Sequence, residues 1–393
     1  MNSGRKKLGI LVTHPIQYYA PLYRELAKDS SIELTVYFAH RQTMEGQSGA
    51  GFNVPFEWDT PLLEGYGHRF LENRAGSPST DTFWGCDTPE ISDIIAKEEF
   101  DAFAVHGWYN HSYWQAIRAC WRRGVPLMVR GDSQLPPGQG RLAQWLRHPL
   151  HRWFIPKFDA YLCVGRRARE YYLHFGADEQ KCFFSPHAVD SEFFASNKLK
   201  YLSMKTELRR QWSLREDSIV FLFAGKLTGQ KRPLDFCRAI QGAGRPNVEG
   251  LVVGDGPLRA ECEAFVRQSG TPVRFTGFLN QTGMPKAFAA ADVLCLCSEA
   301  ESRGLVVNEA MACGLPALVT ESCGCVPDLI EERETGGVFA KGDVDALAGW
   351  MKCIESDGKL LQKMSEGALR RIQDYSISNA ANGFREALDR MVS

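Results

Sequence analysis

Short apolar runs recur along the whole chain, and longer amphipathic stretches separate most of them. The first half contains KLGILVTH, IELTVYFAH, FDAFAVHG, PLMVRGD and DAYLCVG, and the second half contains SIVFLFAGK, VEGLVVGDG, VRFTGF, ADVLCLCS and PALVT. Unbroken apolar strands that alternate with helices indicate parallel sheets covered on both faces. Two such series in one chain predict an α/β protein with two doubly wound domains.

The alternation breaks once near the middle of the chain. A polar, lysine-rich stretch over residues 196–205 follows His187-Ala188-Val189-Asp190 and precedes the next helix and strand. We therefore expect an N-terminal domain over residues 1–195 and a C-terminal domain over residues 196–372. The last segment, residues 373–393, has a helical pattern and is a separate element.

Composition narrows the class of protein. Lys plus Arg (46) nearly equals Asp plus Glu (47), so the chain lacks the positive charge that marks a general nucleic-acid binder. No run approaches the roughly 20 apolar residues of a membrane span. The polar start and the short apolar run Leu8–Val12 do not match a secretion signal. We expect a cytoplasmic protein whose membrane contact, if any, is peripheral, at the inner face of the cytoplasmic membrane.

The twelve cysteines could form disulfides, bind a metal or remain free. Thiols stay reduced in the cytoplasm, and most of these lie within apolar runs. Cys295/Cys297 and Cys323/Cys325 are C-x-C pairs, whereas zinc sites favour C-x2-C spacing, and no histidine is close to either pair. We interpret the cysteines as buried free thiols and expect no metal site.

Candidate chemistry lies in the second half, because ligands of open parallel sheets bind beyond the carboxyl ends of the strands. One expected strand ends at Gly225, and the loop after it carries Lys226, Lys231 and Arg232. Three cations on one loop suit a diphosphate. A solvated basic loop is an equally good interpretation of the same residues.

Two further strand ends carry weaker signals. Gly254-x-Gly256 follows one strand, and a structural turn explains such glycines more simply than a ligand does. Phe278 follows another strand after Gly277, where its ring would contact a flat base or pack in the core. Packing is slightly favoured for this residue.

The most specific segment surrounds a short helix that Gly304 begins and Gly314 ends. The N–H groups at the start of such a helix suit a phosphate or a sugar hydroxyl. Glu301 lies just before the helix and Glu309 lies within it, and carboxylates accept hydrogen bonds from vicinal sugar hydroxyls. A favourable charge at a helix start explains Glu301 without a ligand. Glu309 fits that explanation poorly, because the apolar run Ala-Met-Ala-Cys follows it.

These motifs occur together in a known family. E-x7-E followed by A-M-A-C-G-x-P, and preceded by G-K-L…K and G-x-G-P, closely resembles the retaining GT-B glycosyltransferases of glycosyltransferase family 4, also called glycosyl transferases group 1. The match covers the C-terminal half in the family's order and spacing, and the N-terminal half matches loosely. The resemblance implies two Rossmann-like domains facing across a cleft. The second domain would hold the nucleotide sugar, and the C-terminal helix would cross back to the first.

The resemblance also implies roles for individual residues. Lys226, where the family usually has Arg, and Lys231 would neutralise the donor diphosphate and the departing nucleotide. Glu301 would hold the transferred sugar and Glu309 the ribose. Together with the strand-end residues above, the candidate catalytic residues are Lys226, Lys231, Glu301, Arg130 and Asp132. The candidate donor-binding residues are Gly225, Arg232, Gly254, Gly256, Phe278, Arg303, Gly304, Leu305 and Glu309.

Retention in this family is credited to front-face attack guided by the leaving phosphate, without an obligatory metal. Preorganised positive charge at the leaving group carries most of that task. The string Asp343-Val-Asp345 precedes a helical pattern and is interpreted as a helix cap rather than a metal ligand. We therefore expect no cofactor, since the nucleoside-diphosphate sugar is the substrate.

The chain departs from the family pattern at two informative positions. Arg130, Gly131 and Asp132 occupy a strand end where the family often has a histidine. Arg303 replaces the family's usual aromatic residue. Because of this second change, the resemblance does not identify which sugar is transferred.

The acceptor is expected at the strand ends of the N-terminal domain, which carry His14, His106, Trp108, Tyr109 and Asp132. Aromatic faces suit sugar CH groups, and a His or Asp side chain accepts the proton of an attacking hydroxyl. Residues 141–158 mix Arg, His and Trp with Leu and Ile, as in helices that lie on an anionic bilayer. Pro149 is expected to interrupt that helix, and ordinary packing is the preferred explanation of its apolar positions.

The leading hypothesis is a retaining glycosyltransferase of cell-envelope or exopolysaccharide assembly. It would move a hexose from a nucleoside-diphosphate sugar to a glycan or lipid-linked acceptor. A GT-B nucleotide-sugar epimerase and a catalytically silent sugar-nucleotide-binding subunit are the alternatives. The four residues Lys226, Lys231, Glu301 and Glu309 argue against a silent subunit.

Overall fold

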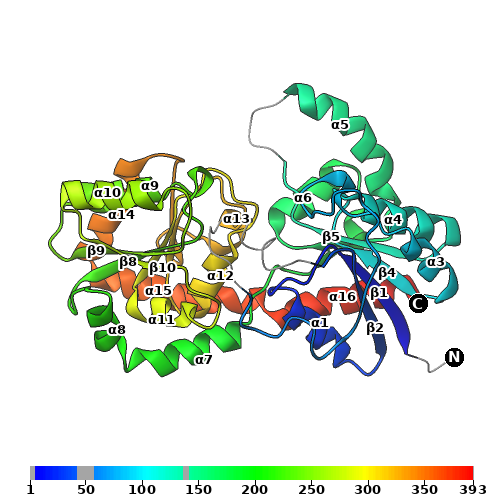
Figure 1. Ribbon diagram of the computed structural model, residues 1–393, viewed down its shortest axis with the longest axis horizontal. Coiled ribbons are helices and arrows are strands. Elements are labelled where there is room, and N and C mark those ends of the chain that lie inside the picture. Colours follow the sequence, from blue (N-terminus) through cyan, green and yellow to red (C-terminus); the bar gives the residue numbers. More distant parts are fainter. Residues whose placement is uncertain (1–4, 42–56, 136–140, 393) are drawn as a thin grey trace. The chain divides into compact units, whose positions relative to one another are not determined.

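The computed structural model describes residues 5–41, 57–135 and 141–392, with side chains from residue 148 onward in the helix that begins at residue 141. These residues form two compact units. Unit 1 comprises residues 5–41, 61–135, 141–187 and 377–392, and unit 2 comprises residues 57–60 and 188–376. Each unit contains one parallel sheet with helices packed on it (Figure 1). The predicted α/β class with two doubly wound domains is confirmed.

The described part of unit 1 contains a seven-stranded sheet in the order β3-β2-β1-β4-β5-β6-β7. Every pair of neighbouring strands is parallel. Its strands are β1 (Lys6–Val12), β2 (Ile32–Phe38), β3 (Gly67–Phe70), β4 (Ala102–Val105), β5 (Leu127–Gly131), β6 (Ala160–Cys163) and β7 (Cys182–Phe184). Its main helices are α1 (Ala20–Ala27), α3 (Glu90–Lys97), α4 (His111–Arg123), α5 (Arg141–Phe154), α6 (Arg166–His174) and α16 (Ile377–Val392).

The described part of unit 2 contains a six-stranded parallel sheet in the order β10-β9-β8-β11-β12-β13. Its strands are β8 (Ile219–Ala224), β9 (Val248–Val253), β10 (Val273–Gly277), β11 (Val293–Leu296), β12 (Ala317–Thr320) and β13 (Gly336–Phe339). Its helices are α7 (Ser191–Leu202), α8 (Lys205–Gln211), α9 (Pro233–Ala243), α10 (Arg259–Ser269), α11 (Met284–Ala290), α12 (Leu305–Ala312), α13 (Val326–Leu329), α14 (Val344–Ser356) and α15 (Gly358–Ile372).

The last helix, α16, belongs to unit 1, although the preceding helices α14 and α15 belong to unit 2. It packs against α1, β6 and β7, and Figure 1 draws it in red beside α1. Ser185 Oγ donates a hydrogen bond to the carbonyl of Ala380 over 2.8 Å. A Cβ on Gly383 would lie 2.2 Å from the carbonyl oxygen of Phe184, so the helix backbone lies directly against β7. The expected return of the C-terminal helix to the first domain is confirmed.

The passage from unit 1 to unit 2 lies between His187 and Ala188. Asp190 caps α7 by accepting a hydrogen bond from the backbone N–H of Phe193. Helix α7 packs on α11 and α12 of unit 2. The boundary that we expected after residue 195 lies within this helix, because most of the polar lysine-rich stretch is part of α7 rather than a linker.

Helix α5 corrects one expectation. Pro149 was expected to interrupt it, but the helix runs from Arg141 to Phe154 with Pro149 inside. Proline removes one helical hydrogen bond, yet its fixed φ is compatible with a helix, so the chain continues.

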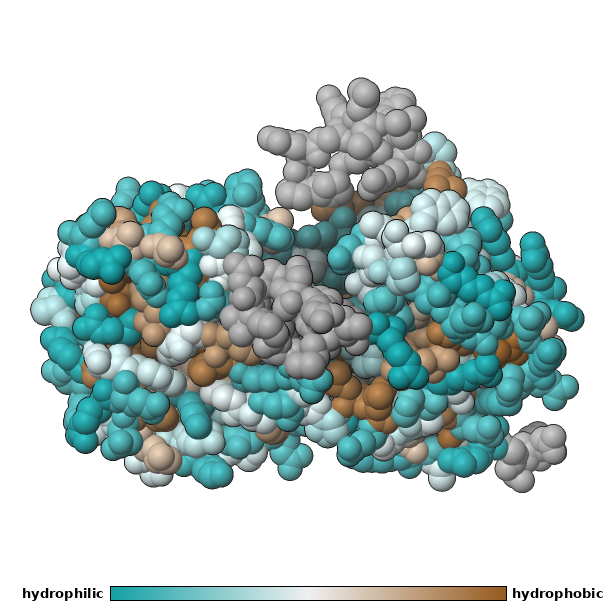
Figure 2. Space-filling model, viewed as in Figure 1, coloured by the Kyte–Doolittle hydropathy of each residue, from teal (hydrophilic) through white to brown (hydrophobic). Residues whose placement is uncertain are grey.

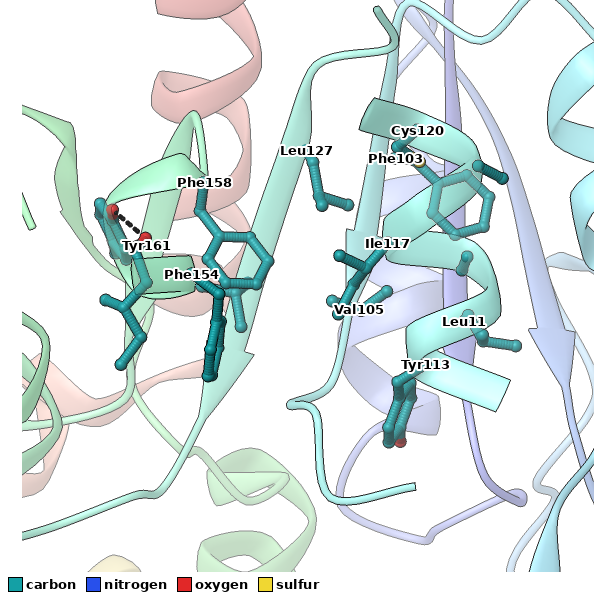
Figure 3. Close-up of a cluster of buried hydrophobic side chains, with 14 of the residues drawn as sticks. Leu11, Phe103, Val105, Tyr113, Ile117, Cys120, Leu127, Phe154, Phe158 and Tyr161 are labelled. Carbon is teal, nitrogen blue, oxygen red and sulfur yellow. Dashed lines mark hydrogen bonds between the residues drawn. The ribbon is translucent and has the colours of Figure 1, made fainter. Parts of the chain in front are cut away.

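Aromatic and aliphatic side chains from α4 and the neighbouring strands fill the core of unit 1. Figure 3 shows Tyr113 and Ile117 of α4 among the side chains of the strands beside it. The hydroxyl of Tyr161 is buried there and donates to the carbonyl of Ile155 over 2.6 Å. On the face that Figure 2 shows, hydrophobic residues form small patches between hydrophilic ones.

All twelve cysteines lie in the described residues and are free thiols, ten of them buried. Burial raises the pKa of Cys295, and burial with the nearby Cys323 raises that of Cys325. No group of three or more His, Cys, Asp or Glu side chains in the described residues is arranged to hold a metal ion.

Candidate active site

Three loops of unit 2 converge at one edge of its sheet. They follow β8, β11 and β12, which are neighbours in the order β8-β11-β12. The loops span residues 225–232, 297–304 and 321–325. Because the strands are parallel, their carboxyl ends lie together, and this is where ligands bind in open α/β sheets.

Hydrogen bonds join the first loop to the second. The backbone N–H of Glu299 donates to the carbonyl of Gln230 over 2.7 Å, and Gln230 Nε2 donates to the carbonyl of Ala300 over 2.8 Å. Lys231 Nζ forms an ion pair with the carboxylate of Glu301. Their side chains are 22% and 15% exposed, so this pair is shielded more than a surface ion pair. Two predicted catalytic residues are thus in direct contact.

Backbone contacts join the second loop to the third. The N–H of Gly324 donates to the carbonyl of Glu301 over 2.8 Å, and Glu301 forms a parallel β-bridge with Cys323. A Cβ on Gly324 would lie 1.8 Å from the carbonyl oxygen of Ser302. Only glycine permits this approach, so the position of Glu301 depends on Gly324.

Helix α12 begins at the end of the second loop. Gly304 precedes it with φ +76°, a left-handed conformation that L-residues adopt only at a cost. A Cβ there would lie 2.9 Å from Leu296 Cδ2. The first N–H groups of a helix have no intrahelical acceptor and attract anions. Leu305 starts the helix, and Glu309 lies one turn later and is 4% exposed. A carboxylate of the expected kind is therefore placed one turn after a helix start whose N–H groups suit an anion.

The glycine turns of unit 2 bring backbone segments together. A Cβ on Gly254 would lie 1.9 Å from the carbonyl oxygen of Gly225, and one on Gly256 would lie 2.7 Å from that of Leu227. The N–H of Leu227 donates to the carbonyl of Asp255 over 2.9 Å. These contacts support the interpretation of G-x-G as a structural turn. Phe278 is half-buried and follows β10, the outermost strand of the sheet on this side.

The cations of the first loop do not form one cluster. Arg232 has φ +51°, and its Nε donates to Asp235 Oδ2 over 2.6 Å. Lys231 is paired with Glu301, and Lys226 is half-buried on the same loop. Arg232 is thus paired with the first turn of its own following helix, whereas Lys231 is paired with Glu301 of the second loop. Lys226 and Lys231 remain the candidates for a diphosphate.

The side chain of Arg303 is turned into the protein. It is 6% exposed, and its Nη1 lies 2.6 Å from Asp328 Oδ2. Only its backbone lies at the start of α12. Neither Asp328 nor its role was visible in the sequence, because 25 residues separate the partners.

The strand ends of unit 1 form an aromatic and basic cluster. Arg130 at the end of β5 is 2% exposed and donates to the carbonyl of Pro186 over 3.0 Å. Its guanidinium lies 5.4 Å from the ring centroid of Tyr19. The Tyr19 ring stacks on His187 at 5.9 Å and meets the edge of His106 at 4.6 Å. Tyr19 and His187 belong to this cluster, although no sequence motif pointed to them.

Burial keeps two histidines of unit 1 neutral. Desolvation, with the charge of Arg130, lowers the pKa of His106 well below its ordinary value. Desolvation and His40 lower the pKa of His14 to about 4, against the opposing effect of Asp81. Both imidazoles are therefore neutral at pH 7 and weak bases.

The remaining acceptor candidates have different surroundings. Tyr109 is 52% exposed and Asp132 is also exposed. Trp108 instead packs against Phe154, with ring centroids 5.3 Å apart. Of the predicted acceptor residues, Tyr109 offers an aromatic face to solvent, whereas Trp108 lies against the core.

Comparisons with known proteins agree with this geometry. The family model described as Glycosyltransferase Family 4 matches residues 22–193, and the model described as Glycosyl transferases group 1 matches residues 204–371. The chain belongs to the GT-B glycosyltransferases of group 1.

Relatives with assigned activities match parts of the chain. Sulfoquinovosyl transferase SQD2 of Arabidopsis thaliana is 29% identical over 50% of this chain and 38% of its own length. An α-1,4-N-acetyl-D-galactosaminyltransferase of Campylobacter jejuni, named for a diphospho-undecaprenol-linked acceptor, is 27% identical over 65% of this chain and 66% of its own. The chain thus spans well under half of the first of these proteins.

Solved structures share the fold over the whole chain. The crystal structure of Anabaena HepE in complex with UDP has a TM-score of 0.73 and 16% identity, and the match covers 98% of this chain and 100% of HepE. At this identity the likeness establishes the GT-B fold. Among the described residues, no helix is long and apolar enough to cross a membrane.

Proposed function

We propose that this protein is a retaining glycosyltransferase that takes a hexose from a nucleoside-diphosphate sugar, with UDP as the first nucleotide to test. The observation that carries the proposal is the junction of three strand-end loops in unit 2. There the Lys231–Glu301 pair lies beside the helix start at Gly304. All three parts of such a donor find suitable groups on this edge. Lysine side chains and helix amides suit the diphosphate, and carboxylates suit the hydroxyls of the sugar and of the ribose.

The roles proposed for these residues follow from their chemistry. Lys226 and Lys231 would stabilise the charge that develops on the leaving diphosphate, which is a large term in transfer reactions. Glu301 would accept hydrogen bonds from the transferred sugar, and Glu309 from the ribose. Because Lys231 is paired with Glu301, the two side chains are held close together, as is required to act on the bond between sugar and phosphate.

The proposal includes independence of a metal. The D-x-D string does not point to a ligand, since Asp343 Oδ1 caps α14 by accepting the N–H of Ala346 over 2.9 Å. Positive charge from lysines and helix amides would take the place of a divalent cation at the diphosphate. Addition of EDTA is then expected to leave turnover unchanged.

Exposed aromatic rings in unit 1 support a saccharide acceptor. Tyr109 is 52% exposed, and Trp84 is 68% exposed. The Trp84 ring lies 4.9 Å from Phe83 and 4.7 Å from His111, so its neighbours hold it in place. Large aromatic faces displayed in this way suit the CH face of a pyranose.

A lipid-linked acceptor in cell-envelope or exopolysaccharide assembly is the finer proposal. The Campylobacter relative is named for such an acceptor. Leu150 and Trp153 on α5 are 50% and 55% exposed, and Lys157 lies 3.6 Å from the Trp153 ring. Apolar and basic groups together suit an anionic bilayer surface. The proposal includes a cytoplasmic location, peripheral to the inner face of the membrane.

Nucleotide release tests the function. The protein is incubated with UDP-, GDP- and ADP-sugars, with and without an undecaprenyl-diphosphate-linked saccharide, and free nucleotide is measured. Acceptor-dependent release from one donor, with retained anomeric configuration in the product, is expected. Conversion of the donor to its epimer without release identifies the epimerase alternative, and binding without either reaction identifies a silent subunit.

A further inference from the structure

Arg303 stands at the start of α12 with its charge buried. Its side chain is 7% exposed and that of Asp328 is 0% exposed, and the two form an ion pair of 2.6 Å. Asp328 lies on α13, one turn beyond the third strand-end loop. The pair therefore links the loop that carries Glu301 to the segment behind it.

Asp328 is itself anchored to the end of the domain. Tyr375 Oη lies 3.3 Å from Asp328 Oδ1, and Arg371 Nε donates to the carbonyl of Asp328 over 2.7 Å. The guanidinium of Arg303 lies 5.8 Å from the ring centroid of Tyr375. Burial and Asp328 raise the pKa of Tyr375 to about 12, although Arg371 and Arg303 oppose this. Tyr375 is thus a neutral hydroxyl donor, and Asp328 is held from three sides.

Packing alone does not explain why an arginine occupies this buried position. Its Nε and Nη2 are buried and have no hydrogen-bond partner among the described residues. A buried charge with unused donors costs free energy, and an apolar residue of similar volume avoids that cost. What Arg303 gains is one short, directed contact with Asp328.

We propose that Arg303 is a positioning residue for the donor site. By holding Asp328, it would fix the backbone from Ser302 to Gly304, and with it the N–H groups of α12 that face the donor. It would not read the sugar with its side chain, which is buried and paired with Asp328. This inference rests on the proposed function, since it concerns how that donor site is held.

Stability measurements distinguish a residue that positions the donor site from one that only stabilises the fold. Removing one member of a buried pair strands the other and destabilises the fold, whereas removing both charges is often neutral. A double variant without buried charge therefore recovers stability. It does not recover a directed contact that holds the loop.

Isothermal titration with UDP on the full chain tests the proposal, with thermal unfolding in parallel. Arg303→Met and Asp328→Asn are each expected to raise the Kd for UDP about tenfold and to lower the Tm. Uridine, which has no phosphate to meet the α12 amides, is expected to bind unchanged. The double variant R303M/D328N is expected to recover most of the Tm while its Kd for UDP stays raised.

A second buried Arg–Asp pair in unit 2 provides the control. Arg209 Nη2 lies 2.7 Å from Asp292 Oδ2, with side chains 3% and 14% exposed. Asp292 accepts the N–H of Val220 at the start of β8, the opposite end of the sheet from the loops. Arg209→Met is expected to lower the Tm and leave the Kd for UDP within about twofold.

Two results would overturn the proposal. One is a wild-type Kd for UDP in the single variants, and the other is recovery of Kd together with Tm in the double variant. If the single variants do not fold, the Kd of the double variant for UDP decides between a positioning and a purely stabilising role. If the wild-type chain binds none of UDP, GDP and ADP, the proposed function fails and this inference with it. If GDP or ADP is bound instead, the same titrations are made with that nucleotide.

Discussion

The two units build their strand-end sites in different ways. In unit 2, backbone hydrogen bonds and glycine contacts join the loops, as between Gly324 and Glu301. In unit 1, side chains form the site, with Arg130 and His106 packed around Tyr19. A site held by backbone is sensitive to single glycines and tolerant at most other positions. A cluster built from side chains is altered by substitutions at each of them, so it can differ between proteins that share the fold.

The largest expected effect tests charge at the donor junction. Lys231→Met is expected to lower kcat about 1,000-fold, because the cation acts on charge that develops only during transfer. Lys341→Met is the control, since Lys341 pairs with the exposed Glu299 on the same edge over 3.1 Å. Steady-state kinetics with the best donor measure both variants, and a similar loss in the two would remove Lys231 from its assigned role.

The second prediction concerns pH and unit 1. The pKa of His14 is lowered to about 4 by burial and His40, against about 6.5 in the unfolded chain. Below pH 6.5 the unfolded chain binds a proton that the folded chain does not. The free energy of unfolding therefore falls as the pH falls through both pKa values, by about 3.4 kcal/mol in all, or roughly 300-fold in the unfolding equilibrium, and most of the change lies between pH 6.5 and 4.

Urea unfolding of the wild type and of His14→Gln over this pH range measures the effect. The variant is expected to lose that part of the pH dependence, while His174→Gln, at an exposed position on α6, is expected to keep it. Identical slopes for the wild type and His14→Gln would show that His14 is not held neutral by its surroundings.

The third prediction tests the backbone of unit 2. Gly324→Ala places a Cβ against the carbonyl of Ser302, so the loop that carries Glu301 must shift. We expect UDP affinity to fall about 30-fold, or ~2 kcal/mol. Gly349→Ala in α14 is the control, since a Cβ there meets nothing within 4 Å. It is expected to bind UDP normally and to be slightly more stable. Normal UDP binding by Gly324→Ala would contradict the close-contact argument.

The smallest effect concerns the exposed aromatic surface of unit 1. Trp84→Ala is expected to raise KM for a saccharide acceptor about fivefold, or ~1 kcal/mol, without changing the KM for the donor. Trp153→Ala, which removes another exposed ring, on α5, is the control for soluble acceptors. A change in donor KM, or an equal effect at Trp153, would remove Trp84 from the acceptor surface.

The sequence predicted more of unit 2 than of unit 1, and the reason is physical. Parallel strands are continuous apolar runs, so both sheets were visible, as was α4, which Asn110 and Gly124 cap at its two ends. The close contacts at Gly304 can be recognised in the sequence, because only glycine fits there. The packing around Tyr19 cannot be recognised in the same way, because many residue types fill such a space.

Long-range pairs were the main features that the sequence could not show. Asp328 lies within an ordinary V-P-D-L string, and nothing local indicates that it contacts Arg303. Likewise, Asp235 forms an ion pair with Arg232. The sequence had suggested Arg232 as a ligand for a diphosphate. Charge pairing of this kind depends on the fold, so a count of cations on one loop overstates what is available to a ligand.

The central claim is that a nucleotide-sugar donor binds at the start of α12, and UDP titration of two variants tests it most directly. Glu309→Ala is expected to weaken UDP binding at least about tenfold, because it removes the proposed ribose acceptor. Asp132→Asn, at the strand ends of unit 1, is expected to bind UDP with wild-type affinity while losing turnover. Wild-type UDP affinity in Glu309→Ala, or its loss in Asp132→Asn, would contradict the claim.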